Sequence, residues 1–221
     1  MKIGPILLVW ILLASACGVR SGKTKRAPKR VVPVAIVIET RNNSDLNFIN
    51  MDIYRFKLLD RLESFQGVDF DLVEPDENPE VVLNLNIDNF ILWPRDERVR
   101  RQVMSRVIQV GTDAAGKPVY QTVRASVDIV QIEQRSNARF LVNLEIKGSP
   151  GKTFKRSFSP NHNYRVTYAD NIQGDSRAVD PRLYFSRSPG MDPDTMDFLT
   201  TLSHEMAERV STELRSFYRN E

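Results

Sequence analysis

Residues 80–93 constrain the fold most strongly, because apolar and polar side chains alternate along them. The apolar set is Val81, Leu83, Leu85 and Ile87, and the polar set on the other side is Asn84, Asn86 and Asp88. A period of two is typical of a strand with one buried and one solvated face, as in antiparallel sheets.

Four further extended runs follow this one along the chain. They cover residues 101–110, 118–134, 139–148 and 153–159, and the gaps between them are short and contain Gly, Asn or Pro. Such gaps predict turns at residues 111–117, 135–138 and 149–152, with sequential antiparallel pairing of the runs.

Two segments have helical spacing. Residues 50–67 place Ile53, Phe56, Leu59 and Leu62 on one side, with Asn50 as a candidate N-cap. Residues 192–221 predict one long helix with Asp192 as N-cap and Pro193 at its first position. Its apolar stripe is Leu199, Leu202, Met206, Val210, Leu214 and Phe217.

Together these elements predict an α/β (α+β) fold. We expect a two-layer sandwich, in which an antiparallel-rich sheet has two long helices packed on one face. The Val/Ile-rich run 31–40 is followed by the first helix and then by a short alternating run at residues 68–73. We expect the two extended runs of this unit to form a parallel pair. Residues 31–221 are expected to be a single domain, in which residues 160–191 have no clear period.

The first 16 residues have the features of a signal peptide. Lys2 precedes an apolar stretch from Ile6 to Leu13, and small residues lead up to Cys17. Small residues before a cysteine resemble the lipobox of bacterial lipoproteins, although Ala14 stands where that motif usually has Leu. The resemblance implies a lipoprotein signal peptide at 1–16 and lipidation of Cys17. The alternative is ordinary cleavage near Ala16, which leaves a free thiol.

The basic charge of the chain is concentrated in a short segment. Seven of the 31 basic residues lie within residues 1–30, where there is no acidic residue, so residues 31–221 carry 24 basic against 28 acidic residues. Residues 17–30 therefore predict a basic, flexible tether next to the lipidated cysteine, and the domain itself is mildly acidic. This distribution gives no indication of nucleic-acid binding.

Three segments resemble catalytic motifs, but the residues around each of them do not fit a catalytic site. Residues 111–118 have the glycine and lysine spacing of a phosphate-binding loop, but Pro118 and an extended run follow, so a hairpin turn is expected. Residues 148–153 are likewise expected to form a turn. His204 begins a motif like that of zinc proteases, but Glu208 replaces the second histidine. We expect a surface histidine there, no metal site, no cofactor and no enzymatic activity.

Two groups of residues remain candidates for a functional site. Arg95, Arg98, Arg100 and Arg101 follow Trp93 and are candidate anion-binding residues, although arginines alternating with Asp96 and Glu97 are also typical of a solvated loop. A hydrolase site would require His162, Asp175 and His204 to converge.

The whole arrangement resembles small periplasmic lipoproteins of Gram-negative envelopes. It is similar to the group that includes the lipopolysaccharide-transport lipoprotein LptE, the penicillin-binding-protein activator LpoB and the curli-type CsgG proteins. The similarity lies in the lipobox-like start, the run PEVVLNLNIDNF, the hairpins and the closing amphipathic helix. It implies a protein held at the periplasmic face of the outer membrane by its lipid anchor, which serves envelope protein partners as an assembly or accessory subunit. The alternative is a binding module for an anionic envelope glycan or lipid.

Overall fold

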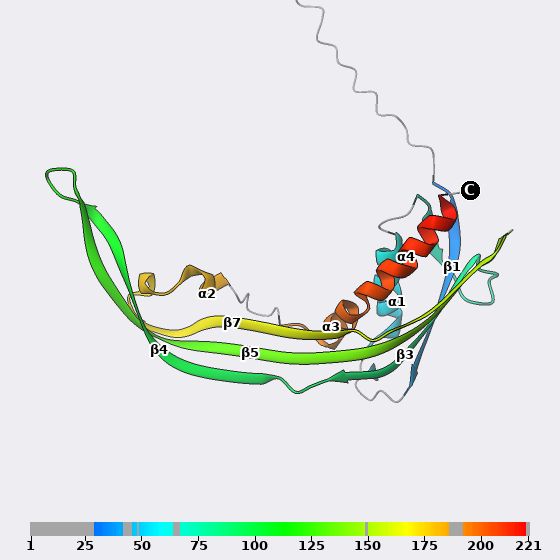
Figure 1. Cartoon of the computed structure of the whole chain (residues 1–221), viewed down its shortest axis with the longest axis horizontal. Coiled ribbons are helices and arrows are strands. Elements are labelled where there is room, and N and C mark those ends of the chain that lie inside the picture. The colour runs from blue at the N-terminus through cyan, green and yellow to red at the C-terminus, as the bar shows by residue number, and fades with distance from the viewer. Residues whose placement is uncertain are drawn as a thin grey trace, which may run out of the picture.

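The computed structural model describes residues 29–41, 46–47, 49–63, 67–148, 150–185 and 192–219. These form a mixed α/β structure, as expected (Figure 1), and the described strands make one seven-stranded sheet. In chain order the elements are β1 (Val31–Arg41), α1 (Met51–Glu63), β2 (Asp69–Leu72), β3 (Val81–Leu92), β4 (Asp96–Thr112), β5 (Pro118–Ile146), β6 (Lys152–Phe158), β7 (Asn161–Gly174), the 3-10 helix η2 (Ser176–Ala178), α2 (Pro181–Phe185), α3 (Thr195–Leu202) and α4 (His204–Tyr218).

The sheet is built around the 29-residue strand β5. On one side β5 pairs with β3 and with β4, and on the other side with β6 and with β7, always antiparallel. Strand β1 pairs in parallel with both β2 and β3, which confirms the parallel pair expected for the first strand–helix–strand unit. Four of the six strand pairings in the described residues are therefore antiparallel.

One end of the sheet forms a compact body with three helices. Strands β1, β3, β5 and β6 share one hydrophobic core with α1, α3 and α4. The alternation predicted for β3 is confirmed, since Val81, Leu83, Leu85 and Ile87 are at most 1% exposed. In α1, however, the buried side is Tyr54, Leu58, Leu59 and Leu62, whereas Ile53 and Phe56 are exposed.

The expectation of two long helices is not confirmed. The helical part of the described chain consists of four helices, and the segment predicted as one C-terminal helix is divided at Ser203 into α3 and α4. The N-cap is Asp194 rather than Asp192, because Asp194 forms a capping box with Asp197. The predicted apolar stripe is nevertheless buried along both helices, with only Phe217 partly exposed.

The other end of the sheet is a long arm that consists of β4, β7 and the first half of β5 (Figure 1). The turn predicted at residues 135–138 is wrong, because β5 runs through it without interruption. Ser136 and Asn137 favour turns locally, but here β3 on one side and β7 on the other pair with them. The aperiodic segment 160–191 begins with the 14-residue strand β7.

The buried side of β5 changes along its length. In the body the even-numbered residues from Ser136 to Ile146 are buried, whereas near the end of the arm the buried residues are Val123, Ala125 and Val127. This second set packs with Ala178 and Val179 beside α2. Strands twist about their own axis, so the two sides of a strand this long exchange their orientation relative to the body.

Candidate binding surfaces

The four arginines predicted to bind anions do not converge. Arg95 forms ion pairs with Asp192 at 2.8 Å and with Glu97 at 3.3 Å, and the hydrogen bond to Asp192 raises the pKa of Arg95. The other three lie on β4, which is a strand rather than a loop: Arg98 pairs with Asp96, Arg101 pairs with Asp128, and Arg100 is exposed. A pocket made by the four together is therefore not present in this arrangement.

The candidate hydrolase residues do not converge either. His162 lies at the start of β7 and Asp175 directly after its end. Twelve residues of extended chain separate them, which corresponds to roughly 40 Å. Asp175 caps η2 and pairs with Arg177, which lowers the pKa of Asp175. His204 is exposed on α4 beside Glu208 at 3.2 Å, in agreement with a surface histidine.

The two segments with the glycine and lysine spacing of phosphate-binding loops are connections between strands. Residues 113–117 join β4 to β5, where the Asp113 side chain accepts hydrogen bonds from the backbone of Ala115 and Lys117, and Gly116 has a φ of 74°. The segment around Gly151 leads from the end of β5 into β6. No group of three or more metal-ligating side chains occurs within the described ranges.

A hollow of about 580 Å³ lies where the body meets the arm, and we call it the elbow hollow. Its lining residues are Trp93, Pro94, Asp96, Arg98, Glu133, Arg135, Ser136, Asn137, Asn161, His162 and Asn163. Hydrogen bonds from Asn163 and Arg165 lower the pKa of Glu133 to about 2, so this carboxylate is charged at neutral pH. Trp93 is 41% exposed and offers a flat aromatic surface among these polar groups.

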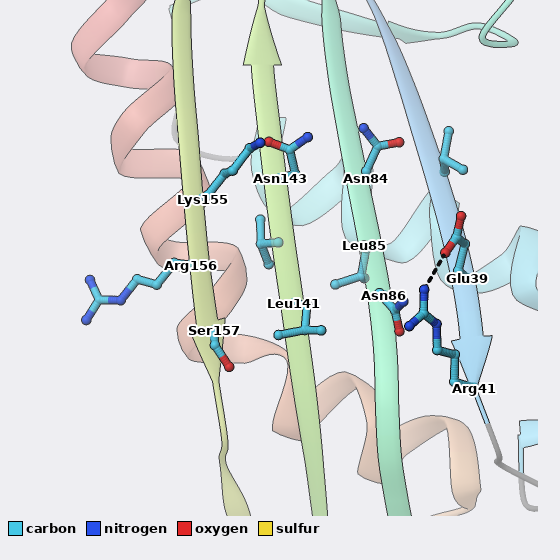
Figure 2. A pocket seen from close by; sticks show the side chains of 12 residues that line it. Glu39, Arg41, Asn84, Leu85, Asn86, Leu141, Asn143, Lys155, Arg156 and Ser157 are labelled. Atoms are coloured by element: carbon cyan, nitrogen blue, oxygen red, sulfur yellow. Dashed lines mark ion pairs between the residues drawn. The ribbon is translucent and has the colours of Figure 1, made fainter.

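A further hollow, of similar volume, lies on the sheet face of the body that faces away from the helices (Figure 2). It crosses β1, β3, β5 and β6, and its polar side chains include Glu39, Arg41, Asn84, Asn143 and Lys155. The side-chain oxygens of Asn86 and Asn143 are buried there without a hydrogen-bond partner. Periodicity predicted a solvated face here, but not a hollow.

The most unusual surface is the free edge of β4. In the described sheet β4 pairs only with β5, so one side of this 17-residue strand is open. Six of the twelve large apolar side chains that are exposed in the described residues lie on the hairpin that β4 forms with the first half of β5. They are Val99, Val103, Val107, Val110, Val119 and Tyr120. An exposed edge with apolar side chains is a template for pairing with another strand.

The lipidation candidate Cys17 lies outside the described residues. Within those residues, none of the helices is both long and apolar enough to cross a membrane. Comparison with protein-family models gives no match, and comparison with curated protein sequences gives none either.

Proposed function

We propose that the protein is an outer-membrane-anchored periplasmic lipoprotein that acts as a non-enzymatic assembly or accessory subunit of a cell-envelope machine. The observation that carries this proposal is the arm, which extends away from the body and ends in a two-stranded hairpin (Figure 1). β7 stops opposite Ala125, so beyond this point no third strand of the described chain flanks the hairpin.

The arm adds little to the stability of a protein that works alone. Two-stranded ribbons are marginally stable in water, and nearly all side chains of β4 are exposed. From residue 134 to its tip the first half of β5 extends roughly 55 Å. A structure that reaches so far and buries so little is well suited to contact another protein.

The lipid anchor is the second part of the proposal. A lipid on Cys17 and the basic residues of the tether would hold the domain close to anionic headgroups. The experiment is palmitate labelling of the wild type and of Cys17→Ser, followed by cross-linking and co-purification from membranes. We expect label on the wild type only, together with a reproducible protein partner. Absence of label from both proteins would refute the anchor.

The elbow hollow supports another candidate function, the binding of an anionic envelope glycan or lipid headgroup. Trp93 could carry the apolar face of a sugar ring. The guanidinium groups of Arg135 and of Arg98, which also pairs with Asp96, match carboxylate or phosphate groups. Arg98 belongs to the arginines identified in the sequence, and Asn161 and Asn163 belong to the segment without a period.

Replacing both Arg98 and Arg135 with Ala is expected to weaken binding of an anionic oligouronate or of phosphatidylglycerol vesicles at least tenfold. Because the contacts are exposed charges, wild-type binding should also fall as salt is raised. Arg156→Ala, an exposed arginine on β6, is the matched control. Which of the two probes binds distinguishes a glycan from a lipid, and binding of neither probe would remove this candidate.

A further inference from the structure

We propose that the free edge of β4 binds an extended, acidic segment of a partner protein as an additional strand. This inference rests on the proposed function, because it names the surface by which the accessory subunit holds its partner. It specifies backbone pairing along β4, apolar contacts on one face of the added strand and carboxylates on the other.

The apolar contacts come from a row of valines. Val99, Val103 and Val107 are 60%, 70% and 62% exposed, and their spacing of four residues places all three on the same face of β4. Adjacent members of the row are roughly 13 Å apart. Opposite Val103 and Val107 on β5 lie Ser126 and Thr122, whose short side chains leave the valines uncovered. An added strand with apolar residues at alternate positions would cover this row.

The charge comes from arginines on the opposite face. Arg98, Arg100 and Arg106 share the parity of Gln102 and Met104, so they face away from the valine row. Arg98 pairs with Asp96, but no carboxylate of the described chain forms an ion pair with Arg100 or Arg106. A strand laid along this edge meets two uncompensated positive charges about six residues apart.

The positions of these charges favour a partner protein over another copy of the chain as the occupant of the β4 edge. An antiparallel pairing of two β4 strands that aligns all three valines has Val103 opposite Val103 and Val99 opposite Val107. The same register places Arg100 opposite Arg106, and it does so twice in a symmetric pair. Like charges directly opposite each other are destabilising in a sheet, and an in-register parallel pairing aligns every arginine with itself. The edge is therefore complementary to Asp or Glu on another protein.

Hydrogen exchange on the full chain tests the proposal with two short peptides. In one peptide valine alternates with glutamate, and in the other it alternates with lysine. We expect the acidic peptide to slow amide exchange along β4, and the basic peptide to have a much weaker effect. Val103→Lys is expected to weaken binding of the acidic peptide at least tenfold. Val31→Lys, a similarly exposed valine on β1, should leave binding unchanged.

A charge-reversal variant tests the role of the arginines separately from folding. Arg100→Glu combined with Arg106→Glu is expected to reverse the preference, so that the basic peptide protects β4 and the acidic one does not. The matched control is Lys155→Glu combined with Arg156→Glu, which makes the same change of charge on β6. Circular dichroism of each variant establishes that it is folded.

Three results would overturn the proposal. The first is unchanged exchange along β4 with both peptides, and the second is equal protection by both peptides before and after charge reversal. The third is concentration-dependent protection of β4 without peptide, which would assign the edge to another copy of the chain. If these tests fail while the membrane partner still co-purifies, only the edge assignment is lost. If the peptides bind but no partner is found in membranes, the proposed function is refuted instead.

Discussion

Shortening the arm is expected to reduce partner recovery from membranes at least tenfold while the body stays folded. Arg106 and Val123 are direct neighbours across β4 and β5, so an Asn-Gly turn can join them and remove residues 107–122. This variant loses Val107, Val110, Val119 and Tyr120, which are four of the six exposed apolar residues of the hairpin. It keeps Val123, Ala125 and Val127 beside η2, and of the side chains that pack against this cluster it removes Ile108.

Stability is the internal control for this variant. The removed segment is largely exposed, so the free energy of unfolding in urea is expected to change by no more than about 1 kcal/mol. Replacing only the tip loop 113–117 with Asn-Gly retains the whole edge and should retain the partner. Undiminished recovery with the shortened arm would show that residues 107–122 have no part in assembly.

The largest loss of stability is expected at the centre of the body. Phe140 is fully buried in β5, paired with Ile87 on β3 and Phe158 on β6. Phe140→Ala removes the ring and leaves a cavity, so the free energy of unfolding in urea should fall by about 3–5 kcal/mol.

The neighbouring residue provides a matched control. Leu141 points to the opposite face of the same strand and is 36% exposed, so Leu141→Ala should cost less than about 1 kcal/mol. Equal losses for the two variants would contradict the arrangement of α1, α3 and α4 over only one face of β5 in the body.

The parts of the fold that follow local rules are predictable from the sequence. The alternation of β3 needs only one buried face, and the turn at 111–117 needs only Asp113, Gly116 and the extended runs beside it. The division at Ser203 is different, because the apolar stripe continues through it and predicts one uninterrupted helix.

The continuity of β5 depends on partners that are distant in sequence. Ser136 and Asn137 have the composition of a turn, yet β3 and β7 approach from both sides and supply the hydrogen-bonding partners of an extended chain. Neither approach can be inferred from four residues. Because a turn was predicted at residues 135–138, the length of the arm was not predicted from the sequence.

The candidate surfaces show the same limit. The arginines can be recognised in the sequence, but whether they are free to bind an anion cannot. Arg95 is paired with Asp192, which lies 97 residues away in the chain. The spacing of Val99, Val103 and Val107 is also visible. Its significance depends on the strand order, in which β5 is the one neighbour of β4 among the described strands.

Photo-cross-linking in intact membranes measures most directly whether the arm is the surface that holds a partner. A photoreactive amino acid is placed at Val103 on the edge of β4 and, in a separate protein, at Leu141 on the open face of the body. We predict a discrete cross-linked product from position 103 and none from position 141. Cross-linking from position 141 alone, or equally from both positions, would contradict the proposed role of the arm.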